Sequence, residues 1–537
     1  MYSDNPDKRV YLYDTTLRDG SQKKGISFSL DDKVKIARLL DELGVAYIEG
    51  GWPGSNPKDM AFFKRMKNES LKHARVVAFG STRKAGVSVE EDSNLEALLE
   101  SETPCVTLVG KSSVMHVERV LRVSREENLS MIKESIAYLK GFDKEVAFDA
   151  EHFFDGYKLD PQYSMQCLQS AFEAGCDWIV LCDTNGGSMP GFIEEVVRAV
   201  DAKFPGKVGI HTHNDSELAV ANALAAVTAG AKQIQGTING YGERCGNANL
   251  VSLAPSLQLK LGFKCLPDES FKELTRVSRS VSEIANLSPD PYAPYVGSAA
   301  FAHKAGLHAS AVARFAQSYE HVDPETVGNE REILVSELAG RGNLRLIASQ
   351  LKLEGVPGGE GALLARVKEF EEKGYKFEDA PGSVELMMRR LDGDYQAPFE
   401  LVDMMVTVSD RKNDGFCSEA VVKLTVAGEL SHTVSEGKGP VHALDCALRK
   451  ALTPWFPEIE QIRLSDYKVR ILDPDSATGA TTRVVVEAAC GNERWSTVGC
   501  SENIIEASGQ ALLESFELYL LRNKLESEQK ELREVVA

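Results

Sequence analysis

The 537-residue sequence lacks the features that mark several large classes of protein. No uninterrupted apolar run approaches the length of a membrane-spanning helix, and the polar segment Met1–Arg9 has no apolar signal-peptide core. The ten cysteines include no C-x-x-C pair, which argues against a disulfide framework and against a zinc knuckle. These absences predict a cytoplasmic protein whose thiols are reduced and mostly buried.

Positive charge is also in short supply. The chain has 80 acidic side chains against 61 lysines and arginines, so its formal net charge is −19. Such a field repels nucleic acids and anionic membranes, and neither is expected as a partner. An anionic substrate would therefore need a local arginine or a bound metal ion. The sequence has no G-x-G-x-x-G or Walker A loop, which argues against a nucleotide crevice in an open sheet.

Eight short β-rich runs recur in the first half of the chain, separated by turns and by amphipathic stretches such as Leu30–Leu40. The runs are Val10–Tyr13, Ala46–Glu49, Arg75–Phe79, Cys105–Val109, Glu145–Asp149, Trp178–Cys182, Val208–His213 and Gln233–Ile238. Eight alternations of strand and helix over about 250 residues are typical of a closed TIM, or (β/α)₈, barrel. We therefore predict an α/β protein whose residues 1–270 form a catalytic TIM barrel. An open, doubly wound sheet is the structural alternative.

Polar side chains gather at the ends of these runs. In a (β/α)₈ barrel the carboxyl ends of the strands form one rim, and that rim carries the active site. The predicted rim includes Asp14–Gly20, Glu49, Glu151, Asp183–Asn185, His211, His213 and the loop that contains Asn247. Any one of these is most simply an ordinary loop residue, but their shared position favours a functional site.

Two histidines stand one residue apart in the seventh run. Because the side chains of a strand alternate between its faces, His211 and His213 point to the same side. Asp19 adds a carboxylate and Asn247 a carbonyl oxygen, giving a mixed nitrogen and oxygen set for a divalent cation; Mg²⁺, Mn²⁺ and Zn²⁺ are not distinguished. Two other interpretations stay open: a pair of ordinary packed histidines, or the two-histidine, one-carboxylate site of a non-haem iron oxygenase.

Three further side chains are candidates for the chemistry. Arg18 is a permanent cation that can donate to a carbonyl oxygen as negative charge grows there. The Thr184 hydroxyl suits a substrate carboxylate. Glu151 is a candidate general acid or base, and a structural salt bridge is its alternative role.

Three segments carry a resemblance: Asp14–Gln22 (DTTLRDGSQ), His211–Asp215 (HTHND) and Asn239–Asn247 (NGYGERCGN). In this order they resemble the signature segments of the 2-isopropylmalate synthase, homocitrate synthase and citramalate synthase family. The resemblance implies a Claisen condensation of acetyl-CoA with a 2-keto acid, followed by thioester hydrolysis. It also implies that the keto acid binds a divalent metal held by Asp19, His211 and His213, with Asn247 near or among the ligands. Arg18 would then polarise the ketone, so that Arg18, Asp19 and Thr184 face the substrate.

Within that family, Ile48–Asp59 and Glu151–Tyr157 are most similar to the citramalate synthase subgroup, which implies pyruvate as the keto acid and a role in isoleucine biosynthesis. Beyond the barrel, His308 and Tyr319 resemble a family histidine and tyrosine that reach a catalytic face, often that of the partner subunit. His308 joins Glu151 as a candidate base. Ordinary packing is the alternative for both His308 and Tyr319.

The rest of the chain predicts two further parts, a helical connector over residues 271–396 and an α+β domain over residues 397–537. The last part contains two copies of a βββα-like pattern. Thr433, Val434, Val441, Ala443, Ala447 and Leu448 recur 64 residues later as Thr497, Val498, Ile505, Ala507, Ala511 and Leu512. This part resembles the family's regulatory domain, which implies a homodimer and feedback inhibition, with isoleucine as the expected effector. A purely structural dimerisation module is the alternative.

Other functions remain as competing hypotheses. Within the family they are 2-isopropylmalate synthase, which uses 2-ketoisovalerate in leucine biosynthesis, and homocitrate synthase, which uses 2-ketoglutarate. A metal-dependent retro-aldol lyase would share the His-x-His and Arg-Asp-Gly motifs but would not need the C-terminal repeat. A metal-dependent effector sensor without catalysis is a fourth possibility, against which Arg18, Glu151 and His308 argue.

Overall fold

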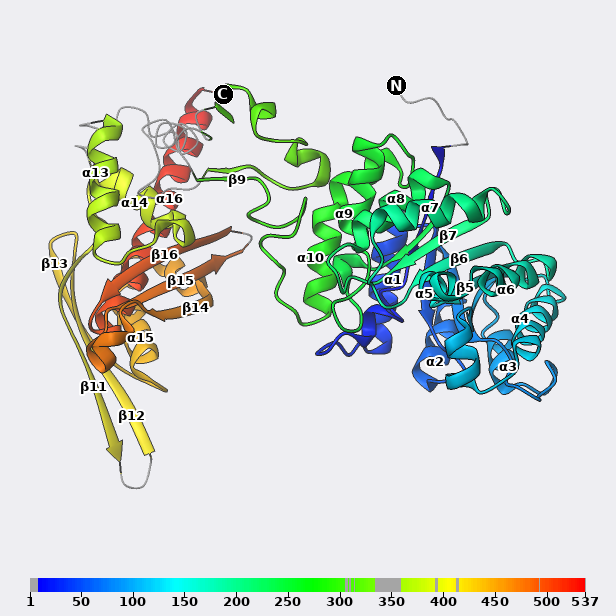
Figure 1. Cartoon of the computed structure of the whole chain (residues 1–537). Coiled ribbons are helices and arrows are strands. Elements are labelled where there is room, and N and C mark those ends of the chain that lie inside the picture. Colours follow the sequence, from blue (N-terminus) through cyan, green and yellow to red (C-terminus); the bar gives the residue numbers. More distant parts are fainter. Residues whose placement is uncertain are drawn as a thin grey trace. The chain divides into compact units, whose positions relative to one another are not determined.

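The computed structural model describes residues 8–304, 308, 311–312, 314–333, 359–391, 395–411, 415–491 and 493–536. The described residues form two compact units (Figure 1). The first contains the described chain up to Phe301 together with Val322–Arg331, and the second contains the described residues of 302–321 and those from Glu332 onward. The chain therefore passes from one unit to the other at three points.

Eight parallel strands of the first unit close into a barrel in the order of the sequence. They are β1 (Tyr11–Asp14), β2 (Tyr47–Gly51), β3 (Arg75–Ser81), β4 (Cys105–Lys111), β5 (Glu145–Glu151), β6 (Trp178–Asp183), β7 (Val208–Thr212) and β8 (Gln233–Gly236). The barrel is closed by β1 and β8, which pair in parallel from Tyr11 opposite Gln233 to Asp14 opposite Gly236. The predicted barrel is confirmed, and its eight predicted strands differ from the observed ones only at their ends.

Helices connect the strands and cover the outside of the barrel (Figure 1). They are α1 (Leu30–Leu43), α2 (Pro57–Met66), α3 (Ser93–Glu100), α4 (Arg125–Lys140), α5 (Phe153–Leu159), α6 (Pro161–Glu173), α7 (Pro190–Asp201), α8 (Ala219–Ala229) and α9 (Leu250–Pro255). The ends of α1 follow from local chemistry: Ser29 and Asp32 form a reciprocal capping box, and Gly44 ends the helix with φ 89°. Between these ends Val34, Ala37, Leu40 and Leu43 recur at helical spacing and are buried.

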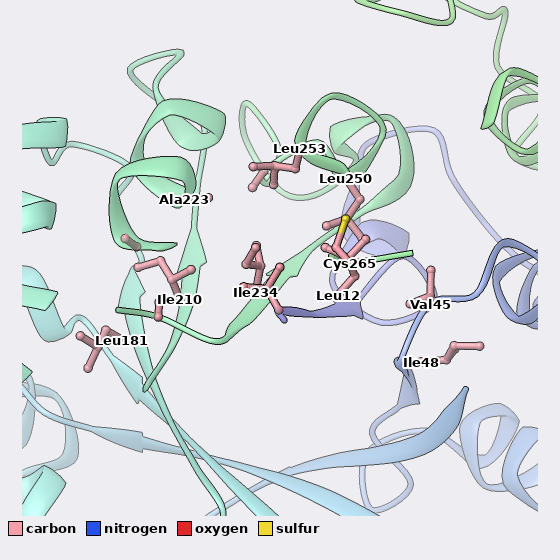
Figure 2. Close-up of a cluster of buried hydrophobic side chains, with 14 of the residues drawn as sticks. Leu12, Val45, Ile48, Leu181, Ile210, Ala223, Ile234, Leu250, Leu253 and Cys265 are labelled. Carbon is pink, nitrogen blue, oxygen red and sulfur yellow. The ribbon is translucent and has the colours of Figure 1, made fainter. Parts of the chain in front are cut away.

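The main apolar core lies between the barrel strands and the surrounding helices. Leu12, Ile210 and Ile234 point outward from β1, β7 and β8 and pack in one cluster with Ala223 of α8 and Leu250 of α9 (Figure 2). Each of these side chains is at most 2% exposed. Because side chains alternate along a strand, the neighbouring residues of the same strands point into the barrel.

The inside of the barrel has two kinds of lining. Tyr13, Tyr47, Val77 and Cys105 form a small apolar cluster inside it. Other inward positions carry polar groups, beginning with Glu49, which accepts a hydrogen bond from the Tyr13 hydroxyl at 2.6 Å. The barrel interior therefore combines aromatic packing with buried polar side chains.

The second unit contains two successive βββα modules, as the sequence repeat predicts. The first is β11 (Glu400–Arg411), β12 (Gly415–Val426), β13 (Glu429–Gly437) and α15 (Pro440–Leu452), and the second is β14 (Arg463–Ile471), β15 (Thr482–Cys490), β16 (Glu493–Ser501) and α16 (Ile504–Val536). Each sheet is antiparallel. The Thr433 hydroxyl donates to the Ala447 carbonyl oxygen at 2.8 Å, and the Thr497 hydroxyl donates to that of Ala511 at 2.7 Å. The repeated residues thus make the same strand-to-helix contact twice.

The remaining α-helices and β-strands of the described chain belong to the predicted connector. They are α10 (Leu274–Ile284) of the first unit, and β9 (Ala302–His303), β10 (Glu332–Ile333), α13 (Gly359–Glu372) and α14 (Pro381–Arg390) of the second. Residues 334–358 of the connector lie outside the described residues. The three-part division at residues 270 and 396 stays a prediction. Among the helices of the described chain, none has both the length and the apolar character needed to span a membrane.

Candidate active site

Asp19, His211 and His213 meet at the carboxyl-end rim of the barrel. Their potential ligand atoms all lie within 4.8 Å of one another, and all three residues are buried. The Nε2 atoms of the two imidazoles are 3.3 Å apart, and Asp19 Oδ2 is 3.4 Å from His211 Nε2. The strand periodicity therefore predicts the histidine pair correctly. Strand β7 ends at Thr212, one residue earlier than predicted, but His213 continues the alternation.

Asn247 is brought to this cluster by the backbone. His213 and Asn247 form an isolated antiparallel bridge, and the Asn247 side-chain nitrogen donates to the Tyr241 carbonyl oxygen at 3.0 Å. That bond leaves the Asn247 side-chain oxygen buried without a hydrogen-bond partner among the described residues. An orphaned amide oxygen on the residue that pairs with His213, together with two imidazoles and a carboxylate, makes a mixed donor set that suits a divalent cation.

A chain of hydrogen bonds fixes the orientation of His211. Gln235 of β8 donates through Nε2 to Asp149 Oδ1 at 2.9 Å, so its Oε1 faces His211 Nδ1 as an acceptor at 2.8 Å. The proton of a neutral His211 therefore sits on Nδ1, and the Nε2 lone pair points into the cluster. Burial raises the pKa of the Asp149 carboxyl to about 7.

Neither Asp149 nor Gln235 was among the residues predicted from sequence. Both occupy inward-facing positions of predicted strands, so strand periodicity was the signal that could have found them.

In this cluster, burial and the neighbouring charges have opposite effects on the pKa values of the ionisable groups. Burial works against the charged form of Asp19, but the Arg18 guanidinium and both imidazoles outweigh it and hold the pKa of that carboxyl below its ordinary value. Burial and the neighbouring His211 lower the pKa of His213 to about 4. The His211 pKa is raised instead, because the Asp19 carboxylate outweighs the effect of burial. At neutral pH an ionised carboxylate therefore faces at least one neutral imidazole.

Arg18 is held beside this cluster by three contacts. Its Nε donates to Glu49 Oε1 at 2.5 Å, its guanidinium lies 3.6 Å from Asp19 Oδ2, and the guanidinium carbon is 3.9 Å from the centre of the Phe79 ring. Glu49 is fully buried and also accepts from the Tyr13 hydroxyl. Glu49 was predicted only as a rim residue; the structure makes it the anchor of the arginine.

Thr184 follows β6 and is restrained from two sides. Its hydroxyl oxygen accepts a hydrogen bond from the backbone N–H of His152 at 2.8 Å, and its carbonyl oxygen accepts from the Arg244 guanidinium at 2.7 Å. Arg244 also donates to both carboxylate oxygens of Asp215, at 2.8 and 2.9 Å. Asp215 therefore supports the site through Arg244. Asn214 instead accepts from the backbone N–H of Ala219 at the start of α8.

Glu151 ends β5 and forms an ion pair with Lys111 at the end of β4. The salt bridge foreseen as the alternative role of Glu151 is present, and its role as a base stays a prediction.

His308 and Tyr319 lie together in the second unit. Their ring centres are 4.2 Å apart, and Tyr319 is 50% exposed. His308 is also exposed. The structure describes this pair only within the second unit, so the catalytic roles of His308 and Tyr319 stay predictions.

Comparison with known proteins places the chain in a family. The HMGL-like family model matches residues 9–281, the homocitrate synthase post-HMGL domain-like model matches residues 295–374, and the LeuA allosteric (dimerisation) domain model matches residues 380–520. An (R)-citramalate synthase from Aquifex aeolicus is 50% identical over 523 residues, which cover 97% of this chain and 99% of that protein. The chain belongs to the family of 2-isopropylmalate, homocitrate and citramalate synthases.

Similarity differs between branches of this synthase family. An (R)-citramalate synthase from Geobacter sulfurreducens is 49% identical over 518 residues, which cover 96% of this chain and 98% of that protein. A probable 2-isopropylmalate synthase from Methanopyrus kandleri is 32% identical over 512 residues, which cover 94% of this chain and 97% of that protein. The resemblance inferred from the three signature segments is confirmed, and so is the greater similarity to the citramalate synthase subgroup.

Proposed function

We propose that the protein condenses acetyl-CoA with pyruvate and hydrolyses the resulting thioester, releasing (R)-citramalate and free CoA in a route to isoleucine. The observation that carries this proposal is the convergence of Asp19, His211 and His213 beside Arg18. It occurs in a chain about half identical to (R)-citramalate synthases over nearly its full length. Such a site suits a small oxo-carboxylate, which offers two oxygens to a cation and a carbonyl carbon to a nucleophile.

The buried cluster would hold the divalent cation through Asp19, His211, His213 and the Asn247 side-chain oxygen. When bound, the cation supplies Lewis acidity that makes the keto carbon more electrophilic. Arg18 donates to the keto oxygen as negative charge develops there, and Glu49 keeps its guanidinium in place. The Thr184 hydroxyl donates to the substrate carboxylate.

Carbon–carbon bond formation needs a base for the acetyl methyl group. Glu151 removes one methyl proton, and the electron pair left behind forms the new bond to the keto carbon of pyruvate. The Lys111 ammonium forms an ion pair with this carboxylate and so holds it at the end of β5. Water then cleaves the thioester of the condensed product and CoA leaves as the thiol. His308 and Tyr319 are proposed to complete the site, where the imidazole is a second candidate base.

The second unit is proposed to form a homodimer and to bind isoleucine as an inhibitor. An apolar row supports the dimer: Met405 pairs with Val421, which pairs with Val434, on one face of the first sheet. Met405 is 56% and Val434 42% exposed, so this face is available to a second copy. A cytoplasmic location is also proposed, and it agrees with ten cysteines that are all free thiols.

A keto-acid panel tests the proposed activity. Purified full-length protein is incubated with acetyl-CoA, a divalent metal salt and one of pyruvate, 2-ketoisovalerate or 2-ketoglutarate, and free CoA is measured with a thiol reagent. We expect kcat/KM for pyruvate to exceed that for 2-ketoisovalerate by about tenfold or more, because a pocket that fits the methyl group of pyruvate is overfilled by two further methyl groups. A preference for 2-ketoisovalerate would assign the 2-isopropylmalate synthase reaction instead.

The same assay separates synthesis from bond cleavage. A retro-aldol lyase releases no free CoA from acetyl-CoA and a keto acid, and a sensor without catalysis gives no product from any of the three. The match of residues 380–520 to the LeuA allosteric (dimerisation) domain favours the synthase over the lyase.

A further inference from the structure

His152 adopts a backbone conformation that few residues other than glycine adopt. Its φ is 58° and its ψ 32°, in the left-handed region, at the junction of β5 and α5. Non-glycine residues are held in this region only when their surroundings impose it, and such residues cluster at functional sites. In this conformation the His152 N–H points at the hydroxyl oxygen of Thr184, 2.8 Å away.

The ring of His152 lies flat against the ring of His116. The ring centres are 3.7 Å apart and the planes are within 10° of parallel. His116 begins a single turn of π-helix, His116–Leu121, that follows β4. The Nδ1 atoms of both rings are buried without a hydrogen-bond partner among the described residues. The nearest carboxylates to the His152 ring nitrogens, those of Glu151 and Asp155, lie at 4.0 and 3.9 Å.

Ring stacking therefore restrains the His152 side chain where hydrogen bonds do not. A residue in the left-handed region relaxes toward a right-handed or extended conformation once its restraint is removed. Either change would turn the His152 N–H away from Thr184. The stack on His116 thus acts together with the hydrogen bond from the Gly156 N–H to the His152 carbonyl oxygen, at 2.9 Å, to stabilise the backbone conformation in which His152 donates to Thr184.

That hydrogen bond decides what the Thr184 hydroxyl can do. With its oxygen accepting from His152, and with its carbonyl oxygen held by Arg244, the hydroxyl hydrogen has no acceptor among the described residues. The hydroxyl is therefore left as a donor at the rim where the substrate carboxylate is proposed to bind.

We propose that His116 and His152 are positioning residues that fix the Thr184 hydroxyl as a donor to the substrate carboxylate. The inference rests on the proposed function, because it assigns the keto acid's carboxylate to Thr184. Neither imidazole exchanges a proton with the substrate; the His116 ring acts by packing and the His152 residue by its backbone N–H. The pair therefore controls binding of the keto acid and leaves acetyl-CoA binding unaffected.

The test compares His116→Ala with His116→Phe in the full-length, metal-loaded protein. The alanine removes the stack, and we expect KM for pyruvate to rise about tenfold while KM for acetyl-CoA stays within about twofold. The phenylalanine keeps a flat ring on His152 without a nitrogen, and we expect it to retain the wild-type KM for pyruvate within about twofold. His73→Ala, at an exposed position before β3, is the control, and thermal unfolding of each variant checks that it folds.

A third variant links the effect to Thr184. In a Thr184→Val background, where the hydroxyl is absent, His116→Ala should change KM for pyruvate by less than about twofold, because its target is already gone. An undiminished effect there would overturn the inference, and so would a phenylalanine variant as impaired as the alanine variant. Failure of the proposed function itself is seen separately, since wild-type protein would then release no CoA with pyruvate.

Discussion

At the scale of single residues, the site depends on two adjacent side chains of opposite charge. Asp19 points at His211, and Arg18 is anchored on Glu49. We expect Asp19→Ala to lose bound metal and turnover together. Arg18→Ala should keep the metal and lower kcat about 10²–10³-fold, because a donor to the developing oxyanion is lost while the residues that would hold the metal remain. Metal content by elemental analysis, measured beside CoA release, checks both. Metal loss in the Arg18 variant, or full turnover by metal-free protein, would contradict the separate roles of Asp19 in metal binding and Arg18 in turnover.

At this scale the sequence predicted the candidate metal ligands but did not predict the side chains that orient them. His211 and His213 follow from strand alternation alone, and Asp19 from its place after the first strand. The bond from His211 to Gln235 joins residues 24 positions apart, and that from Gln235 to Asp149 joins residues 86 apart. Such pairs depend on the register of strands around the barrel. Hydrophobic patterning fixes which face a side chain occupies but not which neighbour it meets.

At the scale of elements, α14 is joined to α16 by a buried carboxylate. Glu385 of α14 is 2% exposed and accepts from Arg389 and from Arg522 of α16, each with a closest distance of 2.6 Å. Burial opposes its charge, but the two guanidinium groups outweigh burial and lower the Glu385 pKa below 4.5. A pKa lower in the folded state stabilises the protein above the unfolded value, and this stabilisation is lost as pH falls through the folded pKa.

Glu385→Gln should therefore destabilise the second unit most at neutral pH. We expect a loss of about 3 kcal/mol at pH 7, because two partly buried guanidinium groups lose their buried counter-charge. The difference from wild type should shrink as pH falls below 4.5 toward the lower pKa of folded Glu385, where the wild-type carboxyl also becomes neutral. Denaturant unfolding at a series of pH values measures it. The control is Glu369→Gln in α13, whose ion pairs with Arg366 and Lys373 are exposed and should contribute little to stability. A pH-independent loss would show that packing, and not charge, is responsible.

Some features of the helices and strands can be predicted from local sequence and others cannot. The capping box of α1 and the strand pattern of the barrel are local signals, and the structure follows them. The π-helical turn His116–Leu121 and the left-handed His152 carry no local signal. Each depends on contacts between loops that follow different strands, here a stack between residues 36 positions apart in sequence.

At the scale of the whole molecule, the chain combines a catalytic barrel with two copies of one βββα module. The repeat at a spacing of 64 residues predicted this duplication. The structure agrees, because the hydroxyls of Thr433 and Thr497 each donate to a backbone carbonyl oxygen of the helix in their own module. The alternatives are a regulatory domain and a purely structural dimerisation module. They differ in one measurable property: a regulatory domain must couple the binding of an effector to events at the barrel.

That coupling is reciprocal, which gives the isoleucine proposal a strict test. If isoleucine lowers the affinity of the full-length protein for pyruvate by some factor, typically about 5–150, then pyruvate must lower the affinity for isoleucine by the same factor. We expect calorimetric titration of isoleucine with and without saturating pyruvate to reproduce the factor found by titrating pyruvate with and without isoleucine. Leucine, a near-isostere, is the control and should bind more weakly. Isoleucine binding without any coupling, or no binding at all, would leave the two βββα modules with a structural role only.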